Sequence, residues 1–174
     1  MQALNLGPCT PAAPAPAPVA AVAAAPPVLT PGMVAEAFRS IDLPASELVV
    51  QPPNGRTLVN FATNFYTEQG SFTREVRLLG QRVELRIWPS RFGWRFGDGR
   101  SLETERPGAP YPHLEVTHTY LADGGVRPSV DTTYAAQFRV NGGPWRDVDG
   151  TVTVPGAPVD LRVLTATPEL VGYR

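Results

Sequence analysis

The stretch Trp94-Arg95-Phe96-Gly97-Asp98-Gly99 decides the fold of this chain. Two aromatic residues alternate around an arginine, as in a strand that buries one face. The Gly-Asp-Gly that follows supplies the backbone freedom of a sharp turn. After a loop rich in proline, His118-Thr119-Tyr120 begins another strand. The two segments together predict a small antiparallel β structure.

Alternation of apolar and polar residues extends this pattern in both directions. Residues 83–88 place Val83, Leu85 and Ile87 on one side and charged side chains on the other, which predicts a strand with one solvated face. The rings of Phe92, Trp94 and Phe96 are expected to fill the core. A further inward row is expected from Thr132, Tyr134, Ala136, Phe138 and Val140.

The remaining strands are expected between turn residues. Leu79-Gly80-Gln81 predicts a hairpin between residues 72–78 and 83–88, and residues 58–66 are expected to form one strand. In that strand Val59, Phe61, Thr63 and Phe65 are expected to face the core. Shorter strands are expected at residues 47–51, 145–154 and 159–166. About nine strands at this spacing predict an all-β, immunoglobulin-like antiparallel sandwich.

A short helix is expected before the strands, at residues 31–44. Thr30 can cap it, Pro31 suits its first position, and Pro44 ends it. Its apolar face is expected to contain Met33, Val34, Ala37, Phe38 and Ile41. The sandwich domain is then expected to cover residues 45–174.

Residues 1–30 contain no charged side chain and consist largely of Ala, Pro and Val. They are expected to be disordered, either as a stiff Pro/Ala tether or as the remnant of a leader that lacks its basic start. Their apolar run, residues 20–25, is too short to span a bilayer. Cys9 is the only cysteine, so no intrachain disulfide can form, and Pro8 before it fits a lipidation site badly.

The charge balance argues against broad classes of partner. The chain has 15 basic residues, all of them arginine, against 16 acidic residues, for a net charge of −1. This balance gives no electrostatic case for nucleic acid. The same sequence contains no Gly-x-Ser-x-Gly elbow and no lysine for a nucleotide-binding loop, so no catalytic residue is assigned.

The Trp-x-Phe-Gly-Asp-Gly run and the later His-Thr-Tyr resemble the signature of the PKD (polycystic kidney disease) domain family. The resemblance covers residues 72–155 and implies an immunoglobulin-like module of a bacterial surface or secreted protein. Its motif residues are Trp94, Phe96, Gly97, Asp98, Gly99, His118 and Tyr120. Arg95 stands where the family usually has aspartate, and the loop at residues 100–115 is longer than usual.

Asp98 and His118 are the motif residues with the most chemistry. Asp98 is expected to accept hydrogen bonds from the amides of its own turn. His118 is expected to donate a ring proton to a backbone carbonyl and so to lock the long loop. The alternatives are a calcium site formed by Asp98 with Asp123 or Asp131, and a ligand or catalytic role for His118. The preferred interpretation includes no cofactor and no metal.

Three aromatic residues are candidate ligand contacts. Trp88, Tyr111 and Trp145 lie at strand ends or in loops, where an exposed ring can stack on a sugar; the alternative is that each covers the core. A second candidate surface is an arginine stripe for an anionic polymer, formed by Arg74, Arg77, Arg82 and Arg86. Cross-strand ion pairs with Glu75 and Glu84 explain that stripe more economically.

These observations predict a non-catalytic extracellular or envelope-associated module for adhesion, spacing or weak binding of a protein or polysaccharide. The alternatives are a carbohydrate-binding accessory module of a secreted hydrolase and a subunit of a surface assembly. No transmembrane segment is expected, and neither the ligand nor the oligomeric state follows from the sequence.

Overall fold

The computed structural model describes residues 27–166; the tail and Cys9 that the sequence singled out fall outside this range, apart from residues 27–30. Within it lie one helix and twelve strands. They are α1 (Pro31–Ser40), β1 (Val49–Gln51), β2 (Arg56–Leu58), β3 (Ala62–Tyr66), β4 (Phe72–Leu78), β5 (Gln81–Arg95), β6 (Ser101–Thr104), β7 (Thr117–Thr119), β8 (Gly124–Val126), β9 (Ser129–Val140), β10 (Arg146–Asp147), β11 (Val152–Val154) and β12 (Leu161–Leu164).

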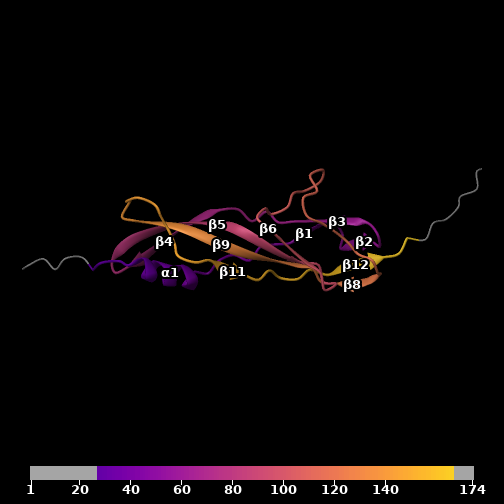
Figure 1. The fold of residues 1–174 in the computed structure, drawn as a ribbon, viewed down its shortest axis with the longest axis horizontal. Coiled ribbons are helices and arrows are strands. Elements are labelled where there is room, and N and C mark those ends of the chain that lie inside the picture. Colours follow the sequence, from indigo (N-terminus) through magenta and orange to yellow (C-terminus); the bar gives the residue numbers. More distant parts are fainter. Residues whose placement is uncertain (1–26, 167–174) are drawn as a thin grey trace, which may run out of the picture.

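The chain forms an elongated, mostly β structure. Figure 1 shows α1 against one end of the long strands β5 and β9, with β2, β8 and β12 at the other end. All strand pairs are antiparallel except β2 with β12. The all-β prediction is therefore confirmed at the level of fold class. No helix within residues 27–166 is long and apolar enough to cross a membrane.

The largest sheet has the strand order β10-β9-β5-β4, with β11 added to β9 and β6 to β5. Its β4–β5 hairpin is the predicted one. Leu78 pairs with Gln81, and Leu79 and Gly80 between them have φ of 50° and 76°. Two positive φ angles match the twist of a two-residue hairpin turn.

Strand β5 is one strand of 15 residues, where the sequence predicted two. Ser90 allows the apolar rows at residues 83–87 and 92–94 to lie on the same face of this one strand. Pro89 pairs with Tyr134 and Arg91 with Thr133, so Ser90 is an extra residue without a partner on β9. A bulge of one residue reverses the alternation. Val83, Leu85 and Ile87 before it therefore share a face with Phe92 and Trp94 after it.

Two smaller sheets complete the structure, with strand orders β1-β3-β7 and β2-β12-β8. The first sheet faces the end of β5. The ring of Phe65, on β3, meets the ring of Phe96 at 5.2 Å between centroids. Strands β8 and β9 are separated by only two residues, Arg127 and Pro128, and the proline cannot donate to a ladder.

The prediction of one strand at residues 58–66 was wrong. The chain turns at Asn60, whose φ is 60°, and so separates β2 from β3. Since the alternation breaks there, Phe61 is 48% exposed although it was expected in the core. Asn64, expected on the opposite side, is buried. Thr63 and Phe65 are buried as predicted.

Two other boundaries also differ. Residues 145–154 form β10 and β11 instead of one strand, since Gly150 makes a turn with φ of 88°. Helix α1 stops at Ser40 instead of residue 44. Its start is as predicted, because the Thr30 side chain accepts a hydrogen bond from the Met33 amide. Ile41 is already extended, and this brings Leu43 into the core.

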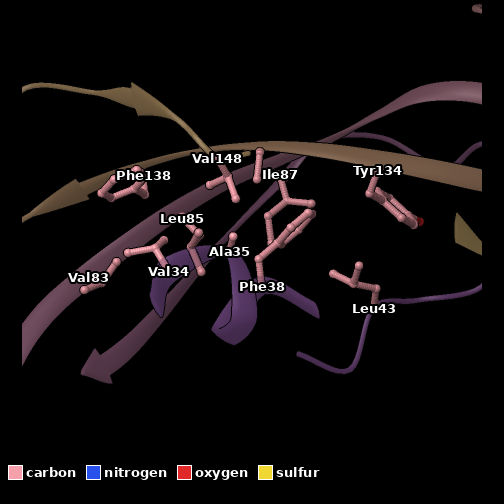
Figure 2. Packing of buried hydrophobic residues seen from close by; sticks show 11 residues of the cluster. Val34, Ala35, Phe38, Leu43, Val83, Leu85, Ile87, Tyr134, Phe138 and Val148 are labelled. Carbon is pink, nitrogen blue, oxygen red and sulfur yellow. The ribbon is translucent and has the colours of Figure 1, made fainter. Parts of the chain in front are cut away.

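The buried side chains form two clusters that share strands β5 and β9. The first cluster joins α1 to one half of the long sheet, and Figure 2 shows Phe38 and Val34 of the helix against Leu85 and Ile87. The second cluster lies between that sheet and the strands β1, β3 and β7. Its buried members are Leu48, Phe65, Phe92, Trp94, Phe96, Val116, Tyr120, Val130, Leu161 and Val163. Trp94 is 1% exposed, as predicted.

Candidate functional site

The motif residues meet at the end of β5, in a cluster that we call the Asp98–His118 clamp (Phe96, Asp98, His118 and Tyr120). Phe96 and Asp98 come from the turn after β5, while His118 and Tyr120 come from β7 and its end. Pairing of β7 with β3 brings the second pair to the first, because it sets His118 opposite Thr63 and so places Tyr120 in the second core cluster with Phe96.

His118 is held on three sides. Its Nε2 lies 2.7 Å from Oδ2 of Asp98. Its ring stacks on Phe96 at 4.1 Å between centroids with 6° between planes, and it meets the ring of Tyr120 edge-on at 4.7 Å. These contacts hold His118 against the turn that precedes the long loop, and the predicted partner was wrong. A carboxylate, and not a backbone carbonyl, holds the imidazole.

Asp98 accepts hydrogen bonds from two directions. The Arg100 amide donates to Oδ1 at 3.0 Å, as the turn predicted, and His118 occupies Oδ2. Burial raises the pKa of Asp98, but the hydrogen bonds from His118 and the Arg100 amide, with the charge of His118, outweigh it and leave this pKa below its usual value. The carboxylate is therefore charged and fully engaged.

Tyr120 links β7 to the end of β5 by a hydrogen bond. Its hydroxyl donates to the carbonyl oxygen of Phe96 at 2.9 Å. Burial, and next the negative charge of Asp98, raise the pKa of this hydroxyl well above its usual range. The phenol is therefore a structural donor and not an acid–base group at ordinary pH.

Two of the three carboxylates in the calcium alternative have other partners. Asp98 faces His118, and Asp131 pairs with the guanidinium of Arg95. Within residues 27–166 no group of three or more His, Cys, Asp or Glu side chains is placed to hold a metal ion. The structure therefore brings Asp98 and His118 together as hydrogen-bond partners.

The three candidate ligand contacts do not form one site. Trp145 lies against the guanidinium groups of Arg86 and Arg139, at 4.4 and 4.7 Å from its ring centroid. Trp88 lies on β5 opposite Ala135 of β9. Its side chain is on the face of the sheet opposite to the buried Val83, Leu85 and Ile87. Tyr111 is separate, in the loop before β7, and its side chain is 75% exposed.

The arginine stripe is partly neutralised by ion pairs, as predicted. Arg82 lies 4.0 Å from Glu75 on the neighbouring strand. Glu84, however, binds Arg139 of β9, which donates from two nitrogens at 2.8 to 2.9 Å. The sequence predicted a pairing of Glu84 with the arginines of β4 and β5. In the structure Glu84 lies directly opposite Arg139 in the register of β5 with β9, and this explains the difference.

The sequence did not predict a surface groove on the long sheet, which we call the outer groove. Its volume is 570 Å³, and it lies on the solvent side of the long sheet, between β5, β6, β9 and β11. It is lined by Ser90, Arg91, Gly93, Trp94, Arg95, Ser101, Leu102, Glu103, Asp131, Thr133, Thr151 and Thr153. The only sequence signal was Gly93, a glycine in the middle of a strand.

A second surface feature is an apolar patch at the end of the molecule distant from α1. Five large apolar side chains are exposed there: Leu58, Phe61, Tyr111, Leu114 and Leu164. Phe61 lies between two hollows, one shared with Leu58 and Leu164 and the other with Tyr111 and Leu114. The turn at Asn60 created this patch, since it directs Phe61 outward.

Comparison of the chain with protein-family models, with curated proteins and with solved structures finds no match.

Proposed function

We propose that this protein is a non-catalytic, extracellular or envelope-associated module, a PKD-like β-sandwich of the immunoglobulin type that works in adhesion, spacing or weak binding. The observation that carries this proposal is the Asp98–His118 clamp. The residues with the most chemistry in the motif bind one another and hold a turn against a strand, so they serve the fold and leave recognition to the surface.

The strand order supports the immunoglobulin-like interpretation. Strands β1, β3 and β7 form one sheet, and the second core cluster joins it to β5 and β9 of the long sheet and to β12 of the third sheet. A parallel pair, β2 with β12, sits at the edge. Two facing antiparallel layers with Greek-key connections are typical of this class of fold.

The proposal is tested by locating the protein in the cells that produce it. A C-terminally tagged full chain is followed by fractionation and by protease treatment of intact cells. We expect the tag in the medium or envelope fraction and digestible from outside. A chain that remains in the cytosol and is protected from the protease would sink the proposal.

A second candidate, a subunit of a surface assembly, is favoured by the apolar patch around Phe61. Exposed apolar side chains that gather in one place mark interaction surfaces more often than scattered ones do. Light scattering over a concentration series would reveal self-association, and Phe61→Ser should abolish it. A strict monomer at every concentration would leave no support for self-assembly through this patch.

A further inference from the structure

The geometry points to the outer groove as a binding site for a neutral polysaccharide, a reading that deepens the proposed function and rests on it. The groove lies on the face of β5 and β9 that is opposite to the buried rows. Along β9 the outward side chains of this face, from Asp131 to Arg139, are all partly exposed. Of these, Arg139 lies against the ring of Trp145.

Gly93 opens the groove, although the fold does not require a glycine there. Its φ lies outside the left-handed region, and an added Cβ would meet only Asp131, at 3.9 Å from the Cβ and 4.0 Å from the carbonyl oxygen. These are normal van der Waals distances. A glycine weakens a strand, and neither the backbone angle nor close packing requires one at position 93. The effect of Gly93 is therefore to leave space above Asp131.

Asp131 forms the polar floor of that space. One carboxylate oxygen pairs with Arg95, while Oδ1 is buried and has no hydrogen-bond partner among the described residues. An unpartnered buried acceptor is costly, so Oδ1 keeps this carboxylate short of one hydrogen bond. A ligand hydroxyl reaches Asp131 through the 13% of its side chain that is exposed, and not at the buried Oδ1.

The walls of the groove contain hydroxyl groups and balanced charges. Thr133 and Thr153 lie side by side with their hydroxyls 2.9 Å apart. Two arginines and two carboxylates cancel, since Arg91 faces Glu103 at 3.4 Å as Arg95 faces Asp131. Neither a polyanion nor a polycation gains net attraction there. Adjacent donors and acceptors without net charge suit the hydroxyl groups of a neutral sugar chain.

Two tryptophans continue the same face beyond the groove. Trp88 precedes the Ser90 bulge and has only Ala135 opposite it. It lies five residues from Gly93 along β5, or about 16 Å at the usual rise of a strand. Trp145 follows, beside Arg86. Partly exposed rings of this kind offer flat apolar surface to a sugar ring. An extended glycan can therefore contact rings and groove together.

The experiment measures binding of the purified full chain to cellohexaose, chitohexaose, xylan, mannan and β-1,3-glucan. Polygalacturonate and a proline-rich peptide represent an acidic polymer and a peptide ligand. Calorimetry serves the oligosaccharides and affinity gels serve the polymers. We expect binding to at least one neutral glycan and weaker or no binding to the acidic polymer and the peptide.

Variants then locate the site. Gly93→Val fills the groove with a side chain that suits a strand and should abolish binding. Asp131→Asn removes a charged acceptor and should weaken binding about 10- to 100-fold. Trp88→Ala should weaken it a few-fold to about tenfold. Gly125→Val is the matched control, because Gly125 is a strand glycine with open space on another sheet.

Thermal melting confirms that each variant is folded. Absence of binding to every neutral glycan, equal binding by Gly93→Val and the parent, or preference for the acidic polymer or the peptide would each overturn the inference. A chain that is found outside the cell but binds no glycan refutes this inference alone. A cytosolic chain refutes the proposed function, while the binding data on the purified protein still stand.

Discussion

Gly97 and Gly99 flank the same aspartate, yet their substitution by alanine should have different effects. Both have positive φ, 83° and 90°, so an alanine at either position is strained by about 1–2 kcal/mol. A Cβ at Gly97 would also lie 2.6 Å from the backbone nitrogen of Arg127 and 2.9 Å from its carbonyl carbon, whereas nothing lies within 4 Å of a Cβ at Gly99. Backbone cannot rotate away as a side chain can.

The contact with Arg127 therefore adds an overpacking cost of about 1–3 kcal/mol at Gly97 only. We expect Gly99→Ala to lower the free energy of unfolding by about 1–2 kcal/mol and Gly97→Ala by about 2–5 kcal/mol, out of the roughly 5–15 kcal/mol typical of a domain. Urea unfolding followed by tryptophan fluorescence measures both. With a slope of about 2 kcal/mol/M, the two midpoints should differ by about 1 M. Equal midpoints would refute the close approach of the Gly97 turn to Arg127.

Three further predictions concern the clamp, the bulge and the helix. Folding lowers the pKa of Asp98, so the charged carboxylate contributes its full stability above the ordinary pKa of 3.8. This contribution is lost as the pH falls through the lower pKa of the folded state. Below pH 3.8 the free energy of unfolding should therefore fall more steeply with pH in the parent than in Asp98→Asn. Deletion of Ser90 turns the residues after it to the opposite face and should prevent folding, whereas Ser90→Ala removes one hydrogen bond and should cost about 1 kcal/mol; circular dichroism of both variants decides, and a folded deletion would contradict the register. Phe38→Ala should cost about 3–5 kcal/mol and Met33→Ala less than about 0.5 kcal/mol, since the first side chain is 1% and the second 38% exposed; equal losses in thermal unfolding would show that α1 does not pack as described.

Local patterns predicted the buried rows of the long sheet because each depends on near neighbours in the sequence. Val83, Leu85 and Ile87 alternate with charged residues, and period-two alternation is a property of the strand itself. The Leu79-Gly80 hairpin is equally local. The bulge at Ser90, between the two buried rows, was not predictable. Nothing in its own sequence marks Ser90, and only its register against β9 makes it a bulge.

Errors arose where a distant partner or an uncommon backbone angle decided the outcome. Asn60 adopts a positive φ, which asparagine tolerates better than most residues, and this single turn exposed Phe61. His118 and Asp98 are 20 residues apart, and the pairing of β7 with β3 brings them together. The outer groove requires four strands at once, so only Gly93 marked it in advance.

The two core clusters explain why β5 and β9 are so long. The second cluster is closed by the layer of β1, β3 and β7, but the first has no facing sheet, and α1 covers it instead. A strand pair that extended beyond its facing layer without the helix would expose Leu85, Ile87 and Phe138, all now buried. Because the bulge at Ser90 keeps both apolar rows on one side, the opposite side of the pair carries mostly polar side chains. The extension and its helix therefore create one continuous outward face, and the outer groove and both tryptophans lie on it.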